Sequence, residues 1–350
     1  MKGLAGLLLL AVGSMLASLG PSAASAHHSR ANFDLGSVVE IKGVVAEFSW
    51  RNPHAYVVVD STTKNGAKAK WTFELNSTPV LKRFGWTPDT LKVGDRVIAH
   101  GNPDRNPNRR FVYALDFVKN GRKIVAWGGP HVAGPKLAAV GSKDFSGVWR
   151  IHFAPGYDVL GRNRPDTKLV NTLPVTAKGQ AEVDAFDPNA NPAWYCGPLT
   201  MPQILGYPYP FQIIRQSKDR LVLRYEADNL VRVVHMNMST HPEDTPRTPL
   251  GHSIGRFENG ELVIETAKFS HVVWGNGKGV DSSERKTTVE RYRLSNDGKT
   301  LTLKFTMTDP EYLSRPVTAE HSYNLLADYV LQDYTCDPKD ARRHLTAGEH

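Results

Sequence analysis

The chain has 350 residues, of which 40% are hydrophobic and 22% charged, and its formal net charge is +8 with a pI near 9.3. This composition excludes an intrinsically disordered chain, and the length predicts about two domains. A basic chain is typical of nucleic-acid-binding proteins, but the export signal described next argues against nucleic acid as the partner. Acidic polymers, anionic small molecules or a solvated surface of mixed charge fit an exported chain better.

The first 26 residues are predicted to be a signal peptide. Lys2 precedes an apolar stretch that is short and rich in small residues, and Ala24-Ser25-Ala26 forms a cleavage signal. Cleavage after Ala26 leaves His27 as the first residue of a protein in the bacterial periplasm or outside the cell. No later segment approaches the roughly 20 apolar residues of a membrane helix, so we expect no transmembrane segment.

Alternating apolar and polar residues predict a first β domain over residues 30–126. Strands are expected at 38–50, 54–61, 69–76, 95–101 and 110–120, with a short helix at 77–85. Three strands, a helix and two strands is the order of an OB-fold, a small Greek-key barrel. The following residues, 127–143, are rich in Gly, Ala and Pro and are predicted to be a linker.

A second β domain is predicted over residues 144–340. Its first strand, 144–153, contains GVW at 147–149, which resembles the G-x-W signature of lipocalin-like barrels. A helix is expected at 176–186, and strands at 211–216, 220–227, 230–236, 261–269, 287–294, 300–308, 317–325 and 329–335. About nine strands without crossover helices most economically close on themselves. The sequence therefore predicts an all-β protein, an OB-like small barrel followed by a lipocalin-like antiparallel β-barrel.

Two cysteines, Cys196 and Cys336, are predicted to form a disulfide, because distant cysteines usually pair in an oxidising compartment. A closed loop of about 140 residues contributes up to roughly 4–5 kcal/mol in the chain-entropy description. Two buried thiols are the alternative. The sequence has no C-x-x-C motif, which argues against a redox or zinc-ribbon role.

Residues 251–255, GHSIG, match the G-x-S-x-G pattern of the serine-hydrolase nucleophile elbow. An elbow requires a strand before the serine and a helix after it. Residues 245–250 contain two prolines, and the residues after Gly255 predict a hairpin instead. Asp281 and His321 follow in the hydrolase order, but order alone is a weak criterion. We interpret the glycines as permitting a tight backbone path into the second barrel.

Polar residues of the second domain predict a pocket inside its barrel. Acid–base chemistry such as isomerisation or elimination is favoured over serine hydrolysis, with His252, Glu284, Tyr225 and Arg291 as the candidate catalytic residues. The direction of Arg291 is open, because residues 287–294 break strict alternation. An inward arginine needs a carboxylate partner, for which Glu226, Glu284 and Glu290 are candidates, and such a pair is often only structural.

The candidate ligand-binding residues are Tyr207, Tyr209, Trp194, His235 and Arg232. Three of them belong to two aromatic and proline-rich stretches, 194–198 and 207–211. These stretches are predicted either to line an apolar ligand mouth or to plug one end of the barrel, anchored by Cys196.

The predicted mature N-terminus is a candidate copper or zinc site. The terminal amine and imidazole of His27, with His28 and His54 as further ligands, would form a brace that resembles the copper sites of some secreted oxygenases. Imidazole ligands suit both metals. The alternative is a flexible tail with ordinary histidines.

Several short motifs carry a resemblance to exported bacterial proteins. AHHS at 26–29, FD at 33–34, GVV at 43–45, NPH at 52–54 and VGD at 93–95 resemble a family of unassigned function. The later motifs FSGVW, YPYPF, GHSIGRF, VERY, DPEY and YTC are similar to a second exported bacterial β-domain family, also of unassigned function. The resemblance implies membership and a domain boundary, with no catalytic residues.

These observations predict an exported protein that binds, and in one version processes, a small and largely apolar organic molecule in the second barrel. Two alternatives belong to other classes: copper or zinc handling through His27, His28 and His54, and an envelope scaffold without a small ligand.

Overall fold

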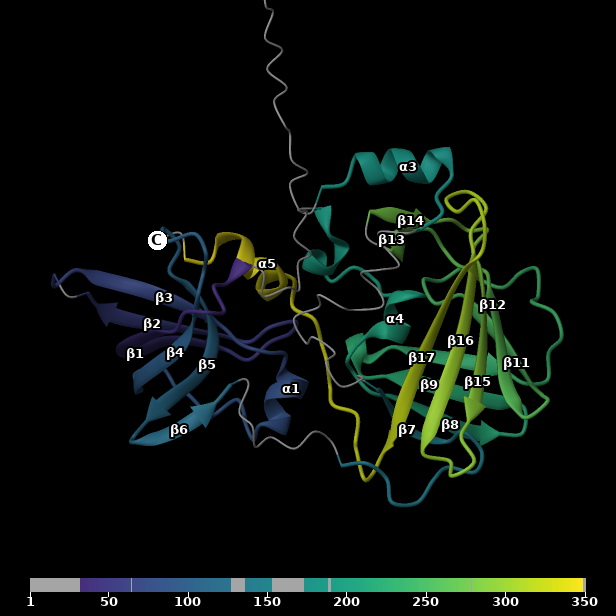
Figure 1. The fold of residues 1–350 in the computed structure, drawn as a ribbon, viewed down its shortest axis with the longest axis horizontal. Helices are drawn as coiled ribbons and strands as arrows, with labels where there is room; N and C mark the ends of the chain where they lie inside the picture. The colour runs from purple at the N-terminus through teal and green to yellow at the C-terminus, as the bar shows by residue number, and fades with distance from the viewer. Residues whose placement is uncertain are drawn as a thin grey trace, which may run out of the picture.

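The computed structural model describes residues 32–63, 65–126, 136–152, 173–187, 190–277 and 279–348. It is a mostly β protein made of two barrels that lie side by side, as Figure 1 shows. The predicted signal peptide and the residues between 126 and 136 lie outside the described residues. None of the helices in the described ranges is both long and apolar enough to cross a bilayer.

The first barrel contains β1 (Val39–Ser49), β2 (Tyr56–Thr62), β3 (Lys68–Glu74), α1 (Thr78–Arg83), β4 (Arg96–Pro103), β5 (Phe111–Lys119) and β6 (Arg122–Val125). The sheet order is β3-β2-β1-β4-β5-β6, and β3 also pairs with β5 in parallel. That extra pairing closes β1 to β5 into the OB-like barrel that the sequence predicts. Its core includes Phe73, Trp86 and Phe117, which are almost fully buried.

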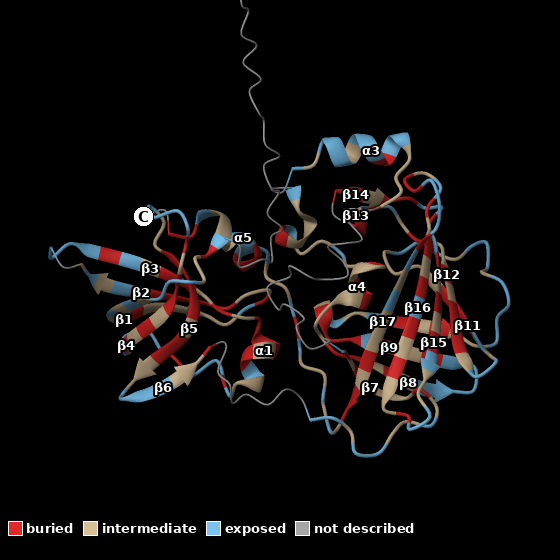
Figure 2. Cartoon of the chain, viewed as in Figure 1, coloured by how far each residue is buried: buried red, intermediate tan, exposed pale blue. Residues whose placement is uncertain are grey.

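The second barrel is a closed ring of nine strands in the order β10-β11-β12-β15-β16-β17-β7-β8-β9. The strands are β7 (Gly147–Ile151), β8 (Phe211–Ser217), β9 (Arg220–Tyr225), β10 (Val231–His235), β11 (His252–Glu258), β12 (Glu261–Ala267), β15 (Thr287–Leu294), β16 (Thr300–Thr308) and β17 (Val317–Leu326). The lipocalin-like fold class is thus confirmed. Buried residues alternate with exposed ones along the strands, as Figure 2 shows.

One pair of neighbours in this ring, β10 and β11, is parallel, whereas the others are antiparallel. A closed ring with an odd number of alternating strands must contain one such pair. The connection over residues 236–251 is long enough to return the chain to the same end of the barrel. Gly255 lets the two strands approach, because a Cβ there would lie 2.6 Å from Cγ1 of Val234.

The second domain also contains short elements between the strands of its barrel. They are α3 (Ala177–Asp184), the 3-10 helix η3 (Pro192–Tyr195), α4 (Gln203–Gly206), the 3-10 turn η4 (Ala227–Asn229) and the hairpin β13 (Val272–Gly277) with β14 (Val280–Ser282). The helix predicted at 176–186 is therefore confirmed as α3, with Thr176 accepting a hydrogen bond from the Gly179 amide.

The strand predicted at 329–335 is wrong. β17 already pairs with β7, so the ring is closed and offers no edge to another strand. Residues 327–337 instead form a tail that crosses to the first barrel, where α5 (Pro338–Thr346) docks. There Arg343 bonds both carboxylate oxygens of Glu47 at 2.5 and 2.7 Å, and Ala347 packs with Phe33 and Tyr113.

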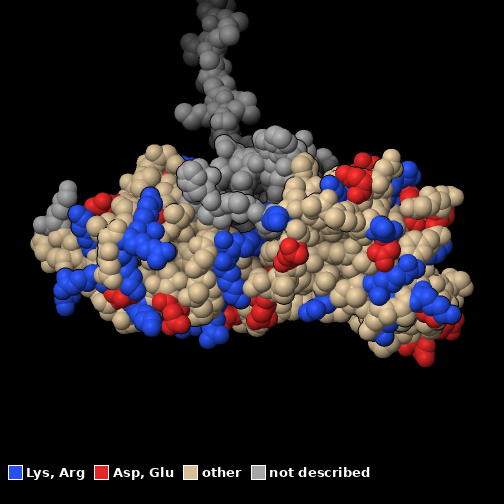
Figure 3. All heavy atoms as spheres, turned by 90° about the horizontal axis from the view of Figure 1, so that it is seen from below, with Lys and Arg blue, Asp and Glu red and all other residues tan. Residues whose placement is uncertain are grey.

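The predicted disulfide between Cys196 and Cys336 is confirmed, with the two Cα atoms 5.9 Å apart. It joins the segment before α4 to the tail. Lys and Arg side chains are interspersed with Asp and Glu over the face drawn in Figure 3, which is the mixed-charge surface that one interpretation of the composition predicts.

Candidate functional site in the second barrel

A buried ion pair spans the interior of the second barrel. Arg232 on β10 donates to Oε1 and Oε2 of Glu290 on β15 at 2.8 and 2.9 Å, and both side chains are at most 2% exposed. β11 and β12 separate these strands in the ring, so the two side chains meet inside the barrel. Burial lowers the pKa of Arg232, but Glu290 and the neighbouring Tyr225 and Tyr292 together raise it above its usual value, and the guanidinium stays charged.

Two tyrosines face the same ion pair. The Tyr292 hydroxyl donates to Oε2 of Glu290 at 2.7 Å. The Tyr225 hydroxyl, on the strand next to Arg232, has no hydrogen-bond partner among the described residues. Burial raises the pKa of both phenols, so they remain neutral donors at physiological pH.

The end of the barrel that holds the ion pair is here called the polar end. Further polar atoms at the polar end lack partners within the described part of the chain. Nε of Arg232 and Oγ1 of Thr288 make no hydrogen bond, and Thr288 faces inward two residues before Glu290. Nη1 of Arg232 has a weak second contact, the Met201 sulfur at 3.8 Å. Buried polar groups are normally paired, so unpaired atoms grouped together mark a place for a missing partner.

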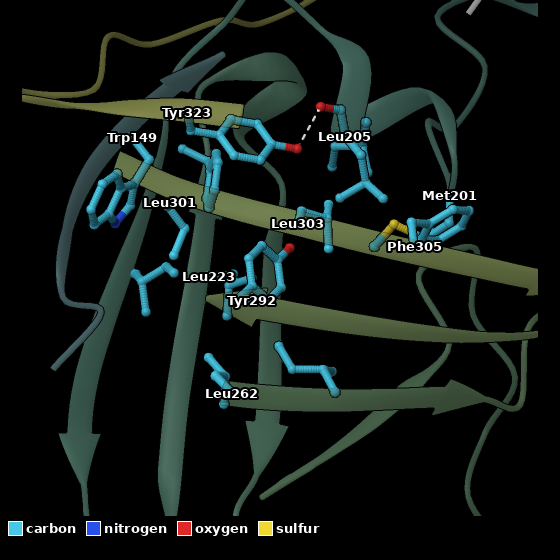
Figure 4. Close-up of a cluster of buried hydrophobic side chains, with 14 of the residues drawn as sticks. Trp149, Met201, Leu205, Leu223, Leu262, Tyr292, Leu301, Leu303, Phe305 and Tyr323 are labelled. Atoms are coloured by element: carbon cyan, nitrogen blue, oxygen red, sulfur yellow. Dashed lines mark hydrogen bonds between the residues drawn. The ribbon is translucent and has the colours of Figure 1, made fainter. Parts of the chain in front are cut away.

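Residues 199–206, here called the closing segment, cover this end of the barrel. Met201, Ile204 and Leu205 belong to the same buried cluster as the barrel strands. Figure 4 shows the Tyr323 hydroxyl donating to the Leu205 carbonyl, at 2.9 Å. The closing segment is also held by Gln203, which donates to the Trp274 carbonyl at 2.6 Å.

A buried lysine fastens the closing segment. Nζ of Lys286 donates to the carbonyls of Met201 and Gly275, the latter at 2.7 Å. Burial lowers the pKa of Lys286 to about 7, and nearby Asp309 opposes this shift. Lys286 is therefore a further titratable group near this end of the barrel.

The rest of the interior is filled by apolar side chains. Trp149, the tryptophan of the G-x-W motif, is fully buried and donates from Nε1 to the Phe145 carbonyl at 2.9 Å. Leu223, Leu262 and Leu301 belong to the same buried cluster, part of which Figure 4 shows.

The structure brings only part of the predicted site together. Tyr225 and Arg232 meet inside the barrel, but Arg291 points outward and pairs with Glu261 at 3.3 Å. Glu284 is also on the surface, 3.0 Å from Arg247. The candidate catalytic residues therefore do not share one site. Arg291 faces outward because Thr288, Glu290 and Tyr292 take the inward positions of β15.

His235 and His252 lie on the outer face, at the parallel junction of β10 and β11. Their rings stack with centroids 4.8 Å apart, and Nδ1 of His252 lies 2.8 Å from Nδ1 of His241. Burial and the neighbouring histidines lower the pKa of His252, and burial lowers that of His241. Neither His235 nor His252 points toward the ion pair.

Ser253 occupies an inward position of β11 and is 1% exposed. Its hydroxyl is 2.8 Å from that of Thr266 on β12. The serine lies within a strand rather than at a strand-to-helix turn, so the G-x-S-x-G match is not an elbow. The glycine interpretation agrees with Gly251, which has a φ of +67°.

The aromatic candidates contact the tail. Tyr209 lies between Tyr207 and Tyr334, with ring centroids 6.0 and 5.1 Å away. Trp194 is buried with its ring 4.9 Å from that of His344 in α5. The residues that close the barrel end are Met201 and Leu205 of the following turn, which the sequence does not single out.

The predicted metal brace falls mostly outside the described residues, because His27 and His28 are among those not described. Nδ1 of His54 lies 2.9 Å from the Leu75 carbonyl oxygen. Within the described part of the chain, no group of three or more His, Cys, Asp or Glu side chains is arranged to hold a metal ion.

The fold and site define an all-β protein with a polar cluster under one end of its larger barrel. Residues 15–112 match the model of a family of unknown function, DUF6152, in agreement with the resemblance of the N-terminal motifs. No curated protein matches the chain. A crystal structure of a single-residue mutant of the fluorescent protein UnaG is 13% identical, with a TM-score of 0.24, and the alignment covers 53% of this chain and 97% of that one. At that TM-score the likeness supports no conclusion about function.

Proposed function

We propose that the second barrel binds a small, largely apolar organic molecule at its polar end, beneath the closing segment. One observation carries the proposal: Tyr225, Arg232 and Thr288 each present an unpartnered polar atom there, among the described residues. A buried donor without an acceptor costs about 1–3 kcal/mol, which a ligand oxygen would recover.

The electrostatics favour a neutral acceptor. Glu290 already balances the charge of Arg232, so a carboxylate ligand would leave one negative charge in excess inside the barrel. A ketone, ester or amide carbonyl accepts from Tyr225 and Arg232 without adding charge. The remaining contacts of the ligand would be apolar.

The ligand takes the place of the Met201 side chain. A thioether is a weak acceptor and a flexible side chain, so moving it removes a weak contact with Arg232 and the packing of one buried side chain. Binding is favoured over turnover. His252 and Glu284 lie outside, and Lys286 is engaged with two carbonyls.

The test uses a neutral fluorescent ketone, 6-propionyl-2-(dimethylamino)naphthalene, and its analogue without the carbonyl. We expect the ketone to bind the native protein and Tyr225→Phe to weaken it about 5- to 10-fold, the loss of one hydrogen bond. Tyr56→Phe, which removes an equally buried hydroxyl from the first barrel, is the matched control. Equal binding of the ketone and its analogue, or no binding of either, would overturn the proposal.

We also propose that the protein acts outside the bacterial cytoplasm. The disulfide supports this compartment, since such bonds persist in oxidising surroundings. Native mass spectrometry of protein purified from its own host tests both proposals, because it shows where the chain begins and whether a small molecule accompanies it.

A further inference from the structure

A pocket lies where the tail passes the turn after β9. Its volume is about 270 Å³, and its walls come from residues 196–199, 228–230 and 334–336. The disulfide Cys196–Cys336 forms part of the wall, and Asn52 of the first barrel pairs with Cys336 as an isolated bridge. The pocket therefore adjoins the contact between the two barrels, and Leu199 in its wall is also the first residue of the closing segment.

Among the described residues that line this pocket, Asp228 is the only acidic one. Its carboxylate has no hydrogen bond or ion pair with any of the described residues. Burial raises the pKa of Asp228 to about 6, so the group is mostly ionised at neutral pH. The turn thus holds a half-buried negative charge without a counter-ion in the described part of the chain.

The neighbours of Asp228 fix its position. Glu226 accepts hydrogen bonds from Arg83 and from the Tyr329 hydroxyl, both at 2.7 Å. The Asn229 side chain bonds the Tyr334 amide at 3.0 Å and Asp333 at 2.7 Å. Between these clamps Asp228 has φ 50° and ψ 23°, a left-handed conformation that is unfavourable for a non-glycine residue. The hydrogen bonds of Glu226 and Asn229 hold the Asp228 carboxylate at the pocket in spite of that cost.

We propose that this pocket binds a small organic cation, an amine or quaternary ammonium, with Asp228 as its counter-ion. Pro198, Leu199 and Leu230 give the pocket apolar walls, and Tyr334 adds an aromatic ring. Carbon-bearing cations are attracted to aromatic faces as well as to carboxylates. One carboxylate among apolar walls does not supply the six or more oxygen ligands that Ca²⁺ or Mg²⁺ requires.

The probe is choline, with 3,3-dimethylbutan-1-ol as a neutral molecule of the same shape. Calorimetry and ligand-observed NMR measure binding of each to the full chain. We expect choline to bind with a Kd of about 1 mM or tighter, and the neutral alcohol to bind at least about tenfold more weakly.

Two variants assign the binding to this pocket. Asp228→Asn should weaken choline at least about tenfold, whereas Asp219→Asn, at the opposite end of β9, makes the same charge change on an exposed residue and should leave binding unchanged. Leu199→Trp keeps the carboxylate but fills the pocket, so it should also abolish binding. It gives a second measurement if Asp228→Asn does not fold.

Three results would overturn the proposal. They are no choline binding up to about 10 mM, equal binding of choline and the neutral alcohol, and unchanged binding in a folded Asp228→Asn protein. The ketone test is read out at Tyr225 and the choline test at Asp228, so either proposal can fail alone.

Discussion

Arg232 and Glu290 place two opposite charges inside a barrel that is otherwise filled mainly by apolar side chains. Both are inward positions on strands whose other inward residues are mostly apolar. Such a pair adds little net stability over an apolar replacement, but removal of one partner leaves a buried charge uncompensated. The loss of either member is therefore destabilising. While both are present, the pair holds neighbouring hydrogen-bond donors in a fixed orientation.

We expect Glu290→Gln to lower the free energy of unfolding by about 3–5 kcal/mol, because Arg232 loses its counter-ion. The double variant Arg232→Met with Glu290→Leu should recover most of that loss. Urea unfolding followed by circular dichroism measures both. Arg256→Met, which breaks a surface pair with Glu265, is the control and should cost at most about 1 kcal/mol. Equal losses in Glu290→Gln and Arg256→Met would contradict the prediction.

At the scale of elements, the closing segment is attached to the barrel by a few polar contacts rather than by a ladder. Lys286, Gln203 and Tyr323 each connect it to the strands or to the β13 region. Its side chains Met201, Ile204 and Leu205 are buried with the barrel strands, so apolar packing holds it together with these bonds.

The pH dependence of stability tests the Lys286 contact. Its pKa is about 7 in the folded protein and near 10.5 in the unfolded chain, so between these values the unfolded chain binds the extra proton. The stability of the native protein relative to Lys286→Met should therefore rise with pH, by up to about 1.4 kcal/mol per unit from pH 7 to 9. Asp309, the charge that faces Lys286, remains in both proteins. Urea unfolding at pH 7, 8 and 9 makes the comparison, and a difference that does not change with pH would count against the contact.

At the scale of the whole molecule, the tail joins the two barrels. It leaves the second barrel after β17, is anchored to the closing-segment side by Cys196–Cys336 and docks on the first barrel through α5. Arg83 adds a direct contact from α1 to Glu226 of the second barrel at 2.7 Å. Both proposed ligand sites lie next to residues held by these connections.

Replacement of both cysteines by serine should loosen the tail. The bond closes a loop with a sequence separation of 140 residues. Its loss is expected to lower the free energy of unfolding by up to about 4–5 kcal/mol in the chain-entropy description. Hydrogen exchange should become faster in α5 and in residues 196–206, with strands β15 and β16 little changed. Equal exchange in α5 with and without the disulfide would show that docking does not depend on it.

The sequence predicts the elements better than the site. Alternation locates most strands to within a few residues, but it misses β11, because the prolines of 245–250 hide the strand that starts at His252. The number of strands in the second barrel is nine as predicted, although 329–335 is excluded and β11 included. Tyr225 and Arg232 are the site candidates that meet inside. Thr288, Met201 and Lys286 carry no pattern that would single them out.

The sequence by itself determines two β domains, their closure into barrels and the pairing of two cysteines, because these depend on local alternation, turn residues and the scarcity of thiols. Only the tertiary structure decides which side of each strand faces inward, where the tail goes and which polar atoms lack partners. The reason is physical: the direction of a side chain depends on strand register, and a one-residue change of register moves it to the opposite face.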